Sequence, residues 1–284
     1  MKGLQYLINL LAVLFLTSSP VQVWSAEKTI YRFGVVPQFE QRKLFRIWRP
    51  ILNELEQRTG LNFKLVGSAK IPVFEQKFEQ GDYDFAYMNP YHLLVAHECQ
   101  GYEPLVRDGG RMLKGIMVVS KNSPIQSVQE LSGKRVAFPS PNALGASLLM
   151  RAELTKLHDV EIIPHYVQTH SSVYLHVALA QTDAGGGVTA TLNSQKPDIR
   201  QKLRIIYETR PMSPHPISAH PRVPEADRLK VQQALLEMTQ TENGAALLSK
   251  IPMRKAVKSS LEDYTPMSSW GLDEFYISTS GHNH

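Results

Sequence analysis

The sequence YDFAYMNPYHLLVAHEC, residues 83–99, places a short apolar run directly before a helix pattern. The run at 83–88 is rich in aromatic residues and typical of a buried strand. Asn89 is a favoured helix cap and Pro90 is favoured in the first turn of a helix, so the pattern predicts a helix over 91–99. A strand that passes straight into a helix is the repeating unit of α/β proteins.

The same alternation extends along the chain in both directions. Predicted strands lie at 31–37, 61–66, 115–120, 135–138, 160–167, 182–188 and 204–207. Predicted helices lie at 44–59, 73–80, 127–131, 144–157, 172–180, 225–239 and 245–248. We therefore expect an α/β protein with two lobes, each a mixed sheet flanked by helices.

One lobe is expected to be inserted into the other. Lobe one would hold residues 27–114 and 212–284, and lobe two would be residues 115–211, the size of a small domain. The chain would then cross between the lobes near 111–115 and again near 209–214. Two extended crossings form a hinge, and closure of such a hinge around a ligand is a common motion.

The first residues have the three-part pattern of a secretory leader. Lys2 gives a positive start, residues 7–16 form an uncharged apolar run, and small residues follow near Ser25 and Ala26, where a signal peptidase would cut. A membrane anchor is the alternative, but ten apolar residues fall short of the roughly 20 that span a bilayer. We expect a cleaved signal peptide at 1–26 and a periplasmic protein.

Composition limits the possible partners. The chain has 31 basic and 26 acidic residues, a net charge of +5, and one cysteine. A mildly basic surface favours an anionic ligand or an anionic membrane face, whereas the scattering of single basic residues argues against binding of nucleic acid. Cys99 cannot form an internal disulfide, so the core has to provide the stability, and we expect Cys99 to be packed.

Common catalytic motifs are missing from the sequence. It contains no GxSxG, no P-loop, no HExxH and no paired cysteines. His215 and His220 lie in a Pro-rich stretch without a clear metal-binding spacing. We therefore expect a binding protein and not an enzyme, with no metal site and no cofactor.

Polar residues follow two of the predicted strands in the first half of the chain. Ligands of open α/β sheets bind at the carboxyl ends of strands, where Gln38, Asn89 and Tyr91 lie. The Tyr91 hydroxyl could donate to an anion. Asn89 serves equally well as a helix cap, and Gln38 equally well as a surface loop residue.

The loop SPNALGAS, residues 140–147, follows the strand at 135–138 and opens a helix. Free backbone N–H groups at a helix start attract anions, and Gly145 permits close approach of a ligand. Ser140, Asn142 and Ser147 would add hydroxyl or amide groups to such an anion site. An ordinary capped helix is the alternative interpretation.

Two further polar groups lie in the second half of the chain. His170, Ser171 and Ser172 precede a helix, where they bind an anion or only cap the helix. A ligand-binding His170 should make affinity depend on pH between about 5.5 and 7.5. Asp183 would accept from a ligand or be a turn carboxylate, and the glycines at 185–187 lack the spacing of a nucleotide motif.

Five segments together resemble the phosphate, phosphite and phosphonate periplasmic substrate-binding proteins of ABC transporters. They are FGVVPQF at 33–39, LEQRTG at 55–60, YDFAYMNPYHLLVA at 83–96, IQSVQELSGKRVAF at 125–138 and QTHSSVYLHVALAQTDAGGG at 168–187. The resemblance spans about residues 30–270. It implies a type II periplasmic binding protein fold, with a small ligand held between the lobes and a membrane permease as partner.

The resemblance also implies which positions bind the oxyanion. These are Tyr91, the loop 140–147, His170 and Asp183. One segment departs from the family, because its Ser/Thr-rich cradle corresponds here to residues 142–145, which carry no hydroxyl groups. A lost donor to a buried oxyanion costs on the order of 1–3 kcal/mol. This departure leaves open a phosphorus oxyanion, another oxyanion or a less charged ligand.

Three functions are compatible with these features. In the first, the protein delivers a solute to the permease of an ABC transporter. In the second, the same fold acts as a sensor that signals to a membrane histidine kinase, and in the third, the least expected, it is an enzyme. We expect a monomer.

Overall fold

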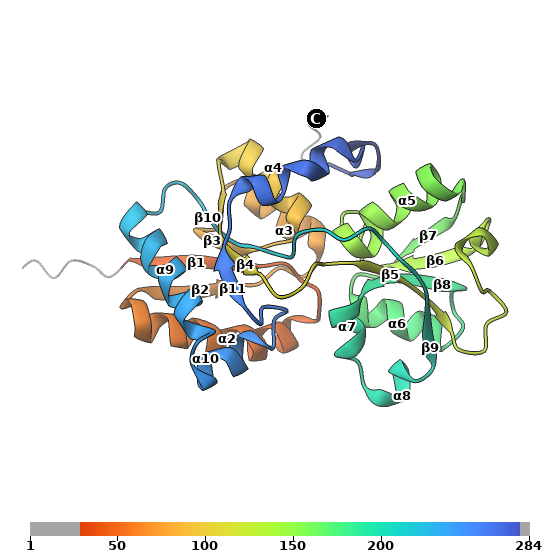
Figure 1. Ribbon diagram of the computed structural model, residues 1–284, viewed down its shortest axis with the longest axis horizontal. Coiled ribbons are helices and arrows are strands. Elements are labelled where there is room, and N and C mark those ends of the chain that lie inside the picture. Colours follow the sequence, from red (N-terminus) through yellow and green to blue (C-terminus); the bar gives the residue numbers. More distant parts are fainter. Residues whose placement is uncertain (1–28, 279–284) are drawn as a thin grey trace, which may run out of the picture.

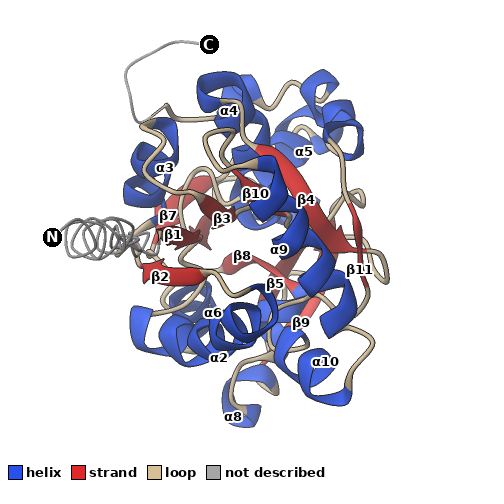
Figure 2. Cartoon of the chain, turned by 90° about the vertical axis from the view of Figure 1, so that its left-hand side faces the viewer, coloured by secondary structure: helices blue, strands red, loops and turns tan. Residues whose placement is uncertain are grey.

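The protein, seen here as a computed structural model, has two lobes joined by two extended segments (Figure 1). The structure describes residues 29–278, so the predicted signal peptide at 1–26 lies outside the described residues. The predicted α/β class is confirmed, because each lobe is built on a mixed sheet, and Figure 2 shows helices around the strands. Between residues 29 and 278, no helix has both the length and the apolar character needed to cross a membrane.

Lobe one is built on a six-stranded sheet in the order β11-β4-β10-β3-β1-β2. Its strands are β1 (Ile30–Val35), β2 (Asn62–Val66), β3 (Phe85–Tyr87), β4 (Glu103–Asp108), β10 (Ile217–Ala219) and β11 (Ala256–Lys258). β1 pairs in parallel with β2 and β3, as successive strand–helix–strand units require, whereas β10 runs antiparallel to β3 and β4.

Lobe two is built on a five-stranded sheet in the order β7-β6-β8-β5-β9. Its strands are β5 (Gly115–Ser120), β6 (Arg135–Phe138), β7 (Ile163–Tyr166), β8 (Ala184–Val188) and β9 (Leu203–Glu208). β6 pairs in parallel with β7 and β8, and β5 pairs antiparallel with β8 and β9. The carboxyl ends of β6 and β8 therefore lie at the same edge of the sheet.

The helices form because apolar residues recur at helical spacing. In the longest helix, α2 (Gln41–Thr59), the buried side chains are those of Leu44, Trp48, Ile51, Leu52 and Leu55. The α-helices are α2 (Gln41–Thr59), α3 (Ile71–Glu79), α4 (Pro90–Gln100), α5 (Leu149–His158), α6 (His170–Ala178), α7 (Thr189–Asn193), α8 (Pro197–Arg200), α9 (Glu225–Met238) and α10 (Glu242–Leu248). The short helical turns are η1 (Val128–Leu131), η2 (Leu144–Leu148), η3 (Leu261–Asp263), η4 (Thr265–Ser269) and η5 (Asp273–Phe275).

The helix predicted at 144–157 begins as a π-helix, η2, and continues as α5. Two glycines allow η2 to lie directly on the sheet of lobe two. A Cβ atom on Gly115 would overlap the carbonyl oxygen of Gly145, and one on Gly186 would overlap the carbonyl oxygen of Ala146. Gly115 of β5 and Gly186 of β8 therefore provide the packing surface for η2, whereas Gly185 and Gly187 face side chains of α6.

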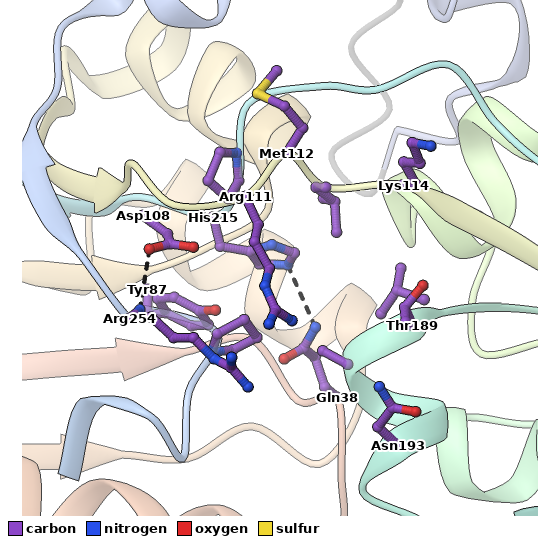
Figure 3. A pocket seen from close by; sticks show the side chains of 15 residues that line it. Gln38, Tyr87, Asp108, Arg111, Met112, Lys114, Thr189, Asn193, His215 and Arg254 are labelled. Carbon is purple, nitrogen blue, oxygen red and sulfur yellow. Dashed lines mark hydrogen bonds between the residues drawn. The ribbon is translucent and has the colours of Figure 1, made fainter. Parts of the chain in front are cut away.

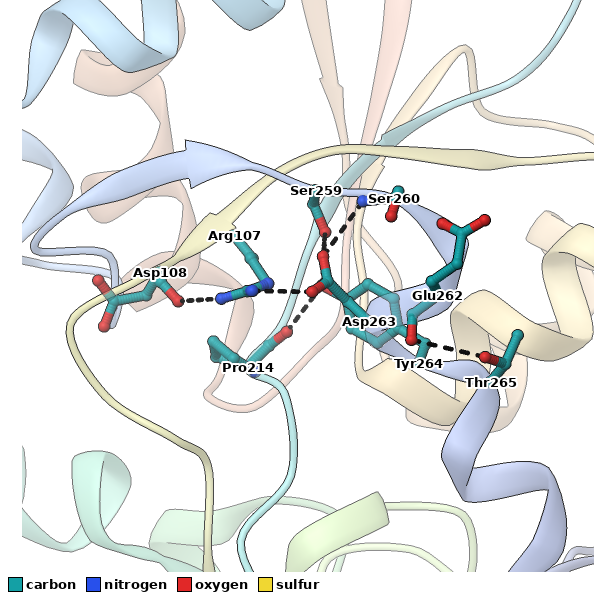
Figure 4. Close-up of polar contacts among 9 residues, drawn as sticks. All are labelled: Arg107, Asp108, Pro214, Ser259, Ser260, Glu262, Asp263, Tyr264 and Thr265. Carbon is teal, nitrogen blue, oxygen red and sulfur yellow. Dashed lines mark hydrogen bonds and ion pairs between the residues drawn. The ribbon is translucent and has the colours of Figure 1, made fainter.

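The two segments that cross between the lobes pair with each other. Leu113 and Met212 exchange backbone hydrogen bonds of 2.8 and 2.9 Å. The second crossing is also fixed to the C-terminal part of lobe one, because the hydroxyl of Tyr264 donates to the carbonyl oxygen of Pro214 at 3.2 Å (Figure 4). An ion pair of 2.8 Å between Arg107 and Asp263 holds the segment that carries Tyr264.

Three strands of lobe one were not predicted from the sequence. β10 lies inside the Pro-rich stretch, and β4 and β11 were not predicted. β10 and β11 have three residues each, too few for an alternating pattern, and they exist because longer strands pair with them. The prediction that Cys99 is packed was wrong, because the last turn of α4 leaves it exposed.

Candidate functional site

A cleft between the lobes contains two large cavities of about 390 and 450 Å³. They share the lining residues Gln38, Tyr87, Arg111, Ala190, Asn193, Pro252 and Arg254, so they are parts of one continuous space. Gln38 and Tyr87 follow or end strands of lobe one, whereas Asn193 lies in α7, directly after β8 of lobe two. Figure 3 shows Arg111 and Arg254 pointing into the space in front of Gln38.

Behind Gln38 lies a much smaller inner pocket of about 20 Å³. It is lined by Val36, Gln38, Ile71, Asn89, Ala143, Leu144, Gly145, Ala146, His170, Val188 and His215. The lobes touch here through hydrogen bonds. The Asn89 amide donates to the carbonyl oxygen of Asn142 at 3.1 Å, and the backbone N–H of His170 donates to the carbonyl oxygen of Gln38 at 3.3 Å.

Two buried imidazoles border the inner pocket. His215 stacks on Tyr87 with ring centroids 5.3 Å apart, and its Nε2 lies 3.5 Å from Nε2 of Gln38. His170 Nδ1 lies 3.2 Å from the hydroxyl of Thr191. Burial lowers the pKa of His170 to about 4, and burial, followed by the neighbouring imidazoles, lowers the pKa of His215 to about 3. Both rings are neutral at pH 7, so these side chains bring no charge to the inner pocket.

The positive charge lies in the large cavities instead. Their lining includes the basic side chains Lys43, Arg111, Lys250 and Arg254, and none of these four forms an ion pair with a carboxylate within residues 29–278. Asp108 contributes the carboxylate of this lining, and three backbone N–H groups, at 2.9–3.3 Å, already donate to its Oδ1. The cleft is therefore suited to an anion.

Four of the residues predicted from the sequence come together in the structure. Gln38, Asn89, Gly145 and His170 all line the inner pocket. Asn89 also caps α4, since its Oδ1 accepts from the backbone N–H of His92 at 2.8 Å. The first turns of α4, η2 and α6 thus meet at one place, as the rule on carboxyl ends of strands predicts.

Other predicted residues of lobe two do not line this pocket, and most of their polar side chains form hydrogen bonds elsewhere. The Asn142 side chain bonds the backbone of Ile277. Ser147 accepts from Arg151 at 3.2 Å, Ser171 accepts from Gln195 at 3.4 Å, and Ser172 lies 2.9 Å from the Thr169 hydroxyl. Ser140 is buried, and its hydroxyl has no hydrogen-bond partner among the described residues.

Two predicted residues lie away from the cleft. The ring of Tyr91 packs against Tyr276, with centroids 5.4 Å apart, and burial raises the pKa of the Tyr91 hydroxyl. Asp183 is exposed and precedes β8, so it lies at the amino end of that strand, where it accepts from the backbone N–H of Arg135 at 2.9 Å. Neither residue lines the inner pocket or the two large cavities.

The basic residues of the cleft were not predicted as ligand contacts. The sequence marked Arg111 only as the start of a crossing between the lobes. His215 was considered only as a metal ligand, and its spacing argued against that role. Arg254 lies between α10 and β11, more than a hundred residues from Arg111 in the sequence, and only the fold brings the two together. One sequence signal could have pointed to Arg111: it lies on a predicted crossing between the lobes.

Comparison with known proteins gives one consistent result. The family model described as the periplasmic substrate-binding protein of phosphonate ABC transporters matches residues 33–264. The chain is 21% identical over 248 residues to the phosphonates-binding periplasmic protein of Escherichia coli K12, covering 82% of this chain and 73% of that protein.

Solved structures with low sequence identity share the fold. A binding protein component of an ABC phosphonate transporter from Pseudomonas aeruginosa has a TM-score of 0.79 at 16% identity, with 86% of each chain covered. PhnD1 from Prochlorococcus marinus, in complex with methylphosphonate, has a TM-score of 0.78 at 16% identity, with 88% of this chain and 100% of that chain covered. The chain therefore belongs to the family of periplasmic substrate-binding proteins of phosphonate ABC transporters.

Proposed function

We propose that this protein captures a phosphorus oxyanion between its lobes in the periplasm and delivers it to the membrane permease of an ABC transporter. The observation that carries the proposal is the basic cleft. Arg111 and Arg254 point into a cavity that Thr189 and Asn193 of lobe two complete (Figure 3). An anion held by these groups contacts both lobes, so its binding favours the closed arrangement.

The other parts of the proposal follow from the sequence. The protein acts as a monomer after removal of the leader at 1–26, and it binds its solute without transforming it. The membership of the two sheets supports lobe limits of 27–114 with 212–284 and of 115–211. Gln38, Asn89, Gly145 and His170 form the polar inner end of the proposed site.

The proposal is tested by a thermal-shift screen of the mature protein. Phosphate, phosphite, methylphosphonate and AMP are compared with sulfate and with glycine, a zwitterion. A ligand at a hundred times its dissociation constant stabilises a protein by about 2.7 kcal/mol, which gives a visible shift. We expect at least one phosphorus compound to stabilise the protein and glycine to have no effect. Stabilisation by glycine alone, or by no phosphorus compound, contradicts the proposal.

A further inference from the structure

We infer that the ligand of this protein is an organic phosphate or phosphonate with a body of about nucleotide size. Its phosphoryl group binds Arg111 and Arg254 in the two large cavities, and the inner pocket does not hold a small alkylphosphonate. This inference rests on the proposed function and narrows it to one class of phosphorus compound.

The sizes of the three cavities favour a ligand larger than a simple ion. The inner pocket measures about 20 Å³, little more than the roughly 10–15 Å³ that one water molecule needs. The connected cavities in front of it measure about 390 and 450 Å³. Pockets of roughly 300–1,000 Å³ are typical for organic ligands of drug size. An ion with a few non-hydrogen atoms would leave most of this space unfilled.

The polar side chains of the inner pocket are poorly placed to bind an anion. Asn89 would have to bind an anion with an amide that already donates to the Asn142 carbonyl, while its Oδ1 already accepts from His92. His170 and His215 are neutral and buried. A phosphonate dianion placed there would lose its hydration without meeting a cationic side chain, and burial of an unpaired charge is costly.

The cationic side chains line the large cavities and not the inner pocket. Arg111 and Arg254 belong to different segments and point into the same space (Figure 3). A guanidinium group binds a phosphoryl group through two parallel hydrogen bonds, a geometry that a single lysine does not offer. Lys43 and Lys250 line the second cavity, where their positive charges attract a second anionic group of the ligand.

Apolar side chains line the same cavities as these cations. Met112, Leu113 and Pro214 line the first cavity, and Phe39, Ile47 and Trp48 line the second. An organic body placed on these surfaces gains about 25 cal/mol for each Å² of apolar area removed from water. Methylphosphonate offers only one methyl group to such a surface.

The inference is tested by titration calorimetry with AMP, ribose 5-phosphate and methylphosphonate. We expect at least one of the two organic phosphates to bind about tenfold or more tightly than methylphosphonate. Arg111→Gln and Arg254→Gln should each weaken binding of that organic phosphate about tenfold or more, because each removes charge-assisted hydrogen bonds to the phosphoryl group. Ribose 5-phosphate, which lacks the base, separates a nucleotide site from a sugar phosphate site.

A matched control is Arg135→Gln. Arg135 is exposed at the amino end of β6 and lines none of the three cavities, so this variant should bind like the wild type. Equal melting temperatures of all ligand-free variants show that each is folded. Methylphosphonate binding as tightly as both organic phosphates, or arginine variants with unchanged affinity, would overturn the inference while leaving the proposed function intact. If no phosphorus compound binds, the proposed function itself fails.

Discussion

Asn142 and Ile277 are joined by a reciprocal pair of hydrogen bonds. Nδ2 of Asn142 donates to the carbonyl oxygen of Ile277 at 2.8 Å, and its Oδ1 accepts from the backbone N–H of Ile277 at 2.9 Å. Asn142 belongs to the loop of lobe two that the sequence predicted to bind the ligand. Its side chain instead holds a segment near the C-terminus.

This segment, residues 270–277, connects the two lobes. On lobe one, Tyr276 packs against Tyr91 of α4. On lobe two, the guanidinium of Arg151 in α5 donates to the carbonyl oxygen of Phe275 at 2.8 Å. The segment therefore restrains the lobes on the side of α4 and α5, and the Asn142 amide is one of its anchors.

Asn142→Ala should lower the free energy of unfolding by about 1–3 kcal/mol, because the backbone groups of Ile277 lose both partners. Urea unfolding of the ligand-free protein measures this change. Asn243→Ala is the control, since the exposed amide of Asn243 makes one hydrogen bond of 3.1 Å, to Glu54, and its loss should cost under about 0.5 kcal/mol. Unchanged stability combined with loss of ligand affinity would instead make Asn142 a ligand residue.

Gly186→Ala should destabilise the protein by about 1–3 kcal/mol, because the added methyl group forces η2 away from β8. Gly67→Ala is the control, since the methyl group there meets only the end of the flexible Gln41 side chain, at 3.2 Å. Chemical denaturation of both variants measures the difference. A Gly186→Ala protein as stable as the Gly67→Ala protein would show that the packing of η2 on β8 is loose.

Histidine burial should make stability fall as the pH is lowered. The folded-state pKa values of His170 and His215, about 4 and about 3, lie below the unfolded value of about 6.5. The unfolded state therefore binds more protons below pH 6.5. For each imidazole, the free energy of unfolding falls by about 1.4 kcal/mol per pH unit until the folded pKa is reached.

Urea unfolding at pH 7 and pH 5 measures this slope. His170→Gln should reduce it, whereas His165→Gln, at an exposed position on β7, should not. An unchanged slope in His170→Gln would mean that His170 is accessible to protons in the folded state. The expectation that His170 makes affinity depend on pH between about 5.5 and 7.5 stays a prediction, while burial lowers the pKa of His170 in the ligand-free protein to about 4.

Local patterns were sufficient for most of the fold. Helix α2 was predicted from its apolar spacing and from Gly60, and the resemblance to phosphonate-binding proteins was confirmed by the family match. β10 and β11 were missed because strands of three residues carry no periodic pattern of their own. Their pairing depends on β4, which lies more than a hundred residues away in the sequence.

The candidate site was predicted only in its inner part. Gln38, Asn89 and His170 were found because each follows a strand at its carboxyl end, a position that the sequence reveals. Asp183 was named as a ligand acceptor or a turn carboxylate, and it lies in the turn before β8, where it accepts from the backbone N–H of Arg135. Arg111 and Arg254 lie on a crossing and on a loop, and no local pattern shows that such side chains converge.

The most direct test of the basic cleft is a crystal structure of the protein with the phosphorus compound that binds it most tightly. We predict that phosphoryl oxygens lie within hydrogen-bond distance, about 2.7–3.2 Å, of the guanidinium groups of Arg111 and Arg254, between the two lobes. A phosphoryl group bound to Asn89 and His170 without either arginine would contradict this account.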